Sequence, residues 1–171
     1  YNPHFGVALT VDDNSYMGLM SISFLDFDHK TEQTVSPMTV FPMGKTNLPP
    51  DSVHGETKYR DKKCYFSFQA ENGRRVLRAW MKDFEGHDPI RMKIILDEEP
   101  RDSMVIATPF EKEKAFYYNQ KIIGMRAKGV VEFRGQRHYF EPEDSFGLLD
   151  WGRGVWTYKN TWYWSAMHGL I

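Results

Sequence analysis

The stretch KCYFSFQAENGRRVLRAWMKDF, residues Lys63 to Phe84, places an Asn-Gly pair between two runs of alternating side chains. Asn72-Gly73 favours a two-residue type I′ turn because both residues tolerate positive φ. In the run after the turn, Leu77, Ala79 and Met81 share one face of an extended chain. The stretch therefore predicts a β-hairpin and places antiparallel sheet at the middle of the chain.

Segments with a similar extended pattern lie on both sides of this hairpin. Further strands are predicted at Phe5–Val11, Tyr16–Phe27, Thr31–Phe41, Ile90–Leu96, Met104–Ala107, Ile122–Phe133 and Arg137–Phe140. Met43–Lys63, rich in Pro, Gly and charge, is interpreted as a long surface loop. Eight to ten short strands, with no long amphipathic helix and no linker, predict one all-β domain over residues 1–171, an antiparallel barrel or sandwich.

The composition limits the possible partners. Lys plus Arg total 22 and Asp plus Glu total 23, a net charge of −1, so no global field recruits nucleic acid or an anionic membrane. No apolar run approaches the roughly 18 to 20 residues that a transmembrane helix needs. The single cysteine, Cys64, excludes an internal disulfide and favours a reducing compartment, so a cytoplasmic location is expected.

The ends of the sequence indicate a piece of a longer protein. The chain begins at Tyr1 without an initiator methionine and stops at Ile171, directly after a strand-like run. We therefore expect this β domain to be a fragment of a larger β protein.

Aromatic side chains concentrate in DWGRGVWTYKNTWYW, residues Asp150 to Trp164, which holds four of the five tryptophans. Asp150 and Arg153 can form a buried ion pair at a glycine-rich corner, or both can face a ligand. We expect Arg153 to lie within hydrogen-bond reach of a carboxylate, most directly that of Asp150. The indoles can pack a core, or they can form an aromatic wall for a flat or polyene-like ligand. Alternation from Asn160 onward predicts that Trp162 and Trp164 share one face.

Two motifs resemble those of a known family. Lys114–Lys121 and Gly129, together with Leu149–Trp156, Trp162 and Trp164, look like the hallmark of the domain-of-unknown-function family 2804. That family is grouped with lipocalin-like (calycin) barrels and is distantly similar to carotenoid hydratases and tocopherol cyclases, which act on apolar isoprenoids. The resemblance implies a lipocalin-like barrel and a chain that is usually longer, with further strands after the tryptophan motif.

Three functions remain open on this basis. The first is a binding module that holds a hydrophobic, isoprenoid- or lipid-like molecule in an aromatic cavity lined by the Asp150–Trp164 segment. The second is a hydratase or cyclase in which Asp150 protonates an alkene, and the third is a structural β domain without a ligand. The candidate ligand-binding residues are Tyr118, Lys121, Trp151, Arg153, Trp156, Trp162 and Trp164.

Other chemistries lack their sequence motifs. The six histidines form no i, i+4 pair, and the chain contains no G-x-S-x-G, Walker or G-x-G-x-x-G motif. We therefore expect no metal site, no cofactor and no nucleophilic hydrolysis.

Overall fold

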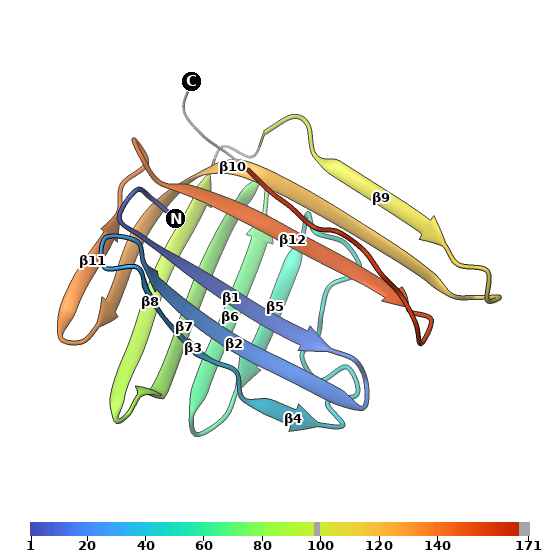
Figure 1. Ribbon diagram of the computed structural model, residues 1–171, viewed down its shortest axis with the longest axis horizontal. Helices are drawn as coiled ribbons and strands as arrows, with labels where there is room; N and C mark the ends of the chain where they lie inside the picture. The colour runs from blue at the N-terminus through green and yellow to red at the C-terminus, as the bar shows by residue number, and fades with distance from the viewer. Residues whose placement is uncertain (98–99, 168–171) are drawn as a thin grey trace.

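A computed structural model describes residues 1–97 and 100–167, and the regular structure among them is β-strand throughout (Figure 1). The strands are β1 (Phe5–Asp13), β2 (Met17–Asp26), β3 (Thr31–Val35), β4 (Met38–Val40), β5 (Gly55–Arg60), β6 (Cys64–Glu71), β7 (Arg74–Glu85), β8 (Asp88–Asp97), β9 (Met104–Pro109), β10 (Phe116–Phe133), β11 (Gln136–Phe140) and β12 (Phe146–Val155). The described residues include no helix long and apolar enough to cross a membrane.

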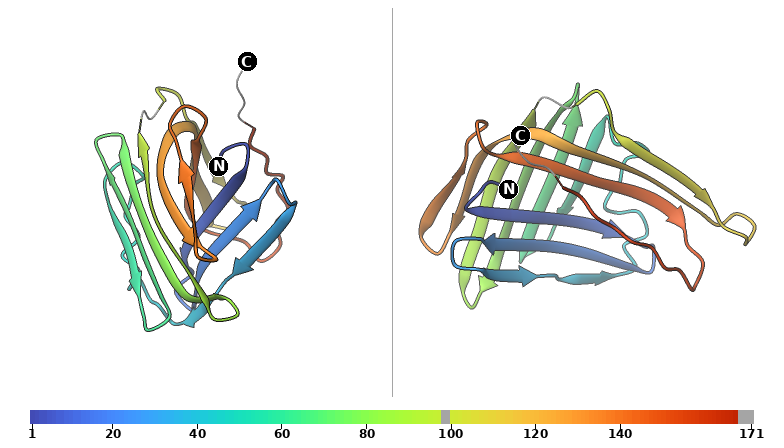
Figure 2. Two further views of the ribbon diagram at one scale, coloured as in Figure 1. Left: turned by 90° about the vertical axis from the view of Figure 1, so that its left-hand side faces the viewer. Right: turned by 45° about the horizontal axis from the view of Figure 1, so that its top comes forward.

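Two antiparallel sheets share these strands. The smaller sheet has the order β1-β2-β3, with β4 pairing with β2 as well. The larger sheet runs β5-β6-β7-β8-β10-β11, and β9 and β12 also pair with β10. The smaller sheet lies across the curled larger one, as the two views in Figure 2 show. The predicted all-β antiparallel architecture is confirmed.

The hairpin predicted at Asn72-Gly73 is β6–β7. Asn72 has φ of 52° and Gly73 has φ of 74°, as the type I′ turn requires. Its register pairs Glu71 with Arg74 and Cys64 with Met81 without a shift. The turn residues therefore fixed the central pairing of the larger sheet.

Strand β10 carries two sets of neighbours. Its C-terminal half pairs with β8 and β11, and its N-terminal half, from Phe116, pairs with β9 and β12. The register with β12 shifts between Ile123 and Met125, around Gly124 with φ of 82°. Such an extra residue bends a strand and exchanges the faces of its side chains. The N-terminal half thereby extends beyond the region in which β10 pairs with β8 and β11.

Aromatic contacts join the two sheets. The ring of Phe5 stacks on Phe140 at a centroid distance of 4.4 Å, and Phe24 meets Phe133 at 5.1 Å. All four side chains are buried in one apolar cluster. Burying one such ring stabilises the fold by about 1.5–3 kcal/mol, so these pairs anchor the smaller sheet.

Several boundaries differ from the sequence prediction. Strand β10 begins at Phe116 rather than Ile122, and β12 was not predicted as a strand. The predicted strand Thr31–Phe41 is split into β3 and β4, and Pro37, which has no N–H for a ladder bond, lies at the break. The predicted loop Met43–Lys63 contains β5, which pairs with β6. This strand lies at the sheet edge and alternates half-buried or buried side chains such as Thr57 with exposed charges, a pattern typical of a protected edge.

Residues 156–167 follow β12 without forming a strand, and this segment is called the tail below. The tail turns at the end of β12 and runs back along it (Figure 1). The predicted strand alternation of Trp162 and Trp164 is therefore wrong, because the segment has no ladder partner.

Candidate functional site: an aromatic pocket under the tail

The β10–β12 pair has two faces with different neighbours. Ile122 is fully buried in the core and lies opposite Leu149, which packs against the same core. Side chains alternate between faces along a strand, so Lys121 and its partner Asp150 lie on the other side. We call this second side the outer face; it carries Tyr117, Asn119, Lys121, Asp150, Gly152 and Gly154.

An ion pair occupies the middle of the outer face. The ammonium group of Lys121 donates a hydrogen bond to Oδ1 of Asp150. The Lys121 side chain is 9% exposed, whereas that of Asp150 is 44% exposed. The Lys121 Nζ also lies 5.6 Å from the ring centroid of Trp164, within reach of a cation–π contact. The tail thus covers the lysine while its carboxylate partner stays in contact with water.

Arg153 lies on the core-facing side of β12, away from Asp150. Its guanidinium donates to the backbone carbonyl of Pro50 at 3.2 Å, and no carboxylate among the described residues pairs with it. The predicted Asp150–Arg153 pair is therefore wrong, since residues three apart in a strand point to opposite faces. Tyr118 and Trp151 share the face of Arg153 and meet edge to face at 5.8 Å.

The two glycines of the Gly-Arg-Gly motif make room on the outer face. A Cβ at Gly154 would lie 2.3 Å from the carbonyl oxygen of Phe116. One at Gly152 would lie 3.0 Å from the ring of Tyr117. The glycines therefore let β12 approach β10 closely and let the Tyr117 ring lie across the strand.

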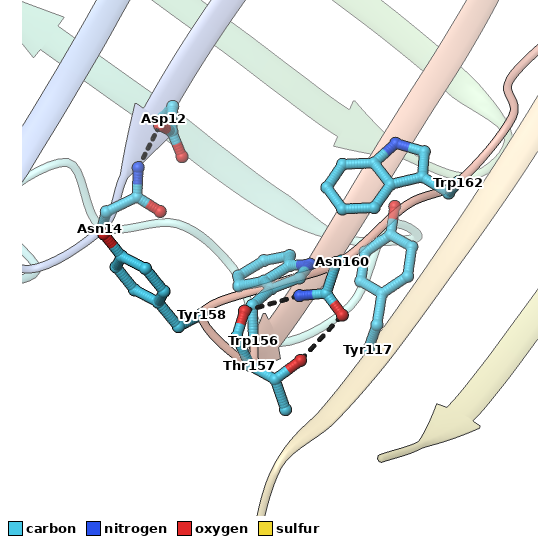
Figure 3. Close-up of a pocket in the computed structure, with 8 residues that line it drawn as sticks. All are labelled: Asp12, Asn14, Tyr117, Trp156, Thr157, Tyr158, Asn160 and Trp162. Atoms are coloured by element: carbon cyan, nitrogen blue, oxygen red, sulfur yellow. Dashed lines mark hydrogen bonds between the residues drawn. The ribbon is translucent and has the colours of Figure 1, made fainter.

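An open pocket with a volume of about 410 Å³ lies where the tail turns over this ring (Figure 3). Its walls include four aromatic side chains, those of Tyr117, Trp156, Tyr158 and Trp162. The Tyr117 and Trp156 rings are 5.4 Å apart at 40°. The polar lining residues are Asp12, Asn14, Thr157 and Asn160.

Hydrogen bonds hold the polar rim in place. Asn160 donates from Nδ2 to the Thr157 carbonyl at 2.6 Å and accepts from its hydroxyl at 2.8 Å, which closes the turn of the tail. Across the pocket, Asn14 donates to Oδ2 of Asp12 at 2.6 Å. Burial raises the pKa of the Asp12 carboxyl above its ordinary value. The β1–β2 turn and the tail thus supply opposite sides of one pocket.

Asn119 adds a buried amide beside the pocket. Its side chain is almost completely buried and donates to the hydroxyl of Tyr117 at 2.9 Å. Because the amide already donates to that oxygen, the phenolic proton remains available for an acceptor in the pocket. The amide therefore also fixes the direction of the ring.

The structure divides the predicted ligand-binding residues into three groups. Trp156 and Trp162 line the pocket, Lys121 and Trp164 contact each other beside it, and Tyr118, Trp151 and Arg153 lie on the core-facing side. Trp162 is 66% exposed and Trp164 is 52% exposed. Two of the predicted residues thus line an open pocket on the outer face of the β10–β12 pair.

Sequence reasoning missed six of the eight residues that line this pocket. Asp12, Asn14 and Tyr117 are not among the predicted ligand-binding residues. Thr157, Tyr158 and Asn160 lay within the tryptophan-rich segment but had no assigned role. Only the Thr-x-x-Asn spacing of the turn gave a local signal, because the approach of the β1–β2 turn is a long-range contact.

The lining residues combine aromatic rings with a few polar side chains. They include no histidine, cysteine or serine that could form a nucleophile–base pair. Within the described residues, no cluster of three or more His, Cys, Asp or Glu side chains could hold a metal ion. Aromatic walls with a few fixed polar groups are typical of small-molecule sites.

Comparison with known proteins identifies the family of this chain. A family model described as "Domain of unknown function (DUF2804)" matches residues 1–171. No curated protein and no solved structure matches the chain significantly.

Proposed function

We propose that this chain, which belongs to the domain-of-unknown-function family DUF2804, is a binding module for a hydrophobic small molecule. The observation that carries the proposal is the aromatic pocket of about 410 Å³ between β10, the β1–β2 turn and the tail. Ligand sites commonly have volumes of about 300–1,000 Å³ and combine apolar walls with a few polar groups.

An isoprenoid- or lipid-like ligand suits this pocket best. The rings of Tyr117, Trp156 and Trp162 offer flat apolar surfaces, and the Tyr117 hydroxyl offers one hydrogen bond. The proposal includes kinship with lipocalin-like barrels, in which a curled antiparallel sheet carries an apolar ligand. It also includes a cytoplasmic location, which the single, fully buried Cys64 favours.

The geometry favours binding over acid catalysis by Asp150. Protonation of an alkene requires a neutral carboxylic acid in an apolar cavity. Asp150 instead accepts a hydrogen bond from the ammonium group of Lys121, and its side chain is 44% exposed to water. We therefore expect Asp150→Asn to leave ligand binding unchanged.

Isothermal titration calorimetry with geraniol, a small isoprenoid alcohol, tests the proposal. Trp162→Ala and Trp156→Ala should each weaken binding about tenfold, because an aromatic wall is removed. Tyr163→Ala is the matched control, since Tyr163 lies in the same tail but is 98% exposed and outside the pocket. Absence of geraniol binding to the wild type, or equal affinity in all variants, would contradict the proposal.

A further inference from the structure

The aromatic pocket has a one-sided charge. Among its eight lining residues, Asp12 is the only one of a type that is ordinarily charged at neutral pH. The lining includes no lysine, arginine or histidine. The rings around it present negative faces because of their π-electron quadrupoles. The electrostatic environment therefore favours a positively charged group.

Asp12 is a half-buried acid that lacks a basic partner among the described residues, in contrast to two other acids of the chain. Asp150 is paired with Lys121, and Glu85 forms a two-bond pair with Arg134. No described basic side chain forms an ion pair with Asp12, whose side-chain partner is the neutral amide of Asn14. Removal of a carboxylate from water without a counter-ion costs free energy. A bound cation would supply the missing counter-ion and offset that cost.

The ring arrangement fits an organic cation rather than a metal ion. Trp156 and Tyr117 are inclined at 40° with centroids 5.4 Å apart, and Trp162 lines the same pocket (Figure 3). Rings that meet at an angle can present several faces to one group, as in the aromatic cages that bind quaternary ammonium ions. A metal ion requires several oxygen, nitrogen or sulfur ligands, and the pocket has one carboxylate.

We propose that the polar end of the ligand is a methylated ammonium group, held by the faces of Trp156, Tyr117 and Trp162 and by the carboxylate of Asp12. A methylated ammonium carries a positive charge but needs few hydrogen bonds, which matches a pocket with much ring surface and few acceptors. This inference rests on the proposed binding function and names the ligand class of the same pocket.

Competition between a cation and its neutral isostere tests the inference. Choline and 3,3-dimethyl-1-butanol have the same shape and differ in charge, and both can be titrated calorimetrically at constant ionic strength. Choline should bind at least about tenfold more tightly, as expected for a desolvated cation–π contact. Equal affinities, or tighter binding of the neutral alcohol, would overturn the inference.

A charge-removing variant separates the role of Asp12 from that of the rings. Asp12→Asn should weaken choline binding about tenfold and should weaken binding of the neutral 3,3-dimethyl-1-butanol by a clearly smaller factor. Glu111→Gln is the matched control, because Glu111 is an exposed acid outside the pocket. Loss of choline affinity equal in both variants would show a general charge effect and overturn the inference.

The source of the ammonium group is resolved by a second probe. Binding to phosphatidylcholine vesicles that Asp12→Asn weakens identifies a lipid headgroup, whereas binding of free choline without vesicle binding identifies a soluble ligand.

Titration with geraniol distinguishes failure of the cation inference from failure of the proposed binding function. If geraniol binds and choline binds no better than its isostere, the binding function stands and the cation inference fails; if neither binds, both fail.

Discussion

Gly154→Ala should destabilise the protein where β12 approaches β10. The added methyl carbon would lie 2.3 Å from the Phe116 carbonyl oxygen and 3.1 Å from the Tyr117 Cα. Both contacts are with backbone, so relief requires the strands to separate and strains their ladder. Overpacking of this kind costs about 1–3 kcal/mol of the free energy of unfolding.

The effect can be measured by urea denaturation followed by tryptophan fluorescence and far-UV circular dichroism. Gly152→Ala provides the comparison within the same motif, because its methyl carbon would meet only side chains, at 3.0 Å or more. We expect that variant to lose less than about 1 kcal/mol, since the Tyr117 ring can shift. Equal stability of wild type and Gly154→Ala would refute the reasoning that Gly154 is required for close strand approach.

Three further predictions concern single side chains. Asp150→Asn should lower the free energy of unfolding by about 1–3 kcal/mol, because it leaves the buried ammonium group of Lys121 without its carboxylate partner. Adding Lys121→Met in a double variant should restore part of this loss. Unchanged urea midpoints would contradict this prediction. His138 contacts the rings of Phe5 and Phe24, and burial lowers its pKa below the ordinary 6.5. The unfolded chain therefore binds a proton that the folded protein does not, so stability should fall as the pH drops below 6.5 and fall less steeply in His138→Phe. Cys64 is fully buried with its pKa raised to about 12, so a thiol reagent at pH 8 should modify it only after unfolding in urea.

Local sequence patterns predicted the hairpin and the all-β class. They did not predict the contacts between segments that are distant in sequence. Asn72-Gly73 specified its hairpin because the turn type depends on two adjacent residues. Strand β5 was missed because its alternating charges also suit a loop, and only its pairing with β6 distinguishes the two. The start of β10 at Phe116 was also missed, since its pairing with β9 and β12 is a long-range contact.

The candidate site was predicted in composition but not in arrangement. The aromatic density of Asp150–Trp164 predicted ligand-binding residues that include two of the four aromatic rings of the pocket, those of Trp156 and Trp162. The partner of Asp150 was assigned by nearness in sequence to Arg153, whereas strand geometry pairs it with Lys121 across the ladder. Asp12 joins the pocket only through tertiary folding, and no local pattern indicates that contact.

The most direct test of the aromatic pocket is a heteronuclear NMR titration of the five indole N–H groups with geraniol. The indole signals of Trp156 and Trp162, which line the pocket, should shift in proportion to bound ligand. Those of Trp80 and Trp151, outside the pocket, should remain in place. Shifts confined to Trp80 and Trp151, or no shift at any indole, would contradict the account.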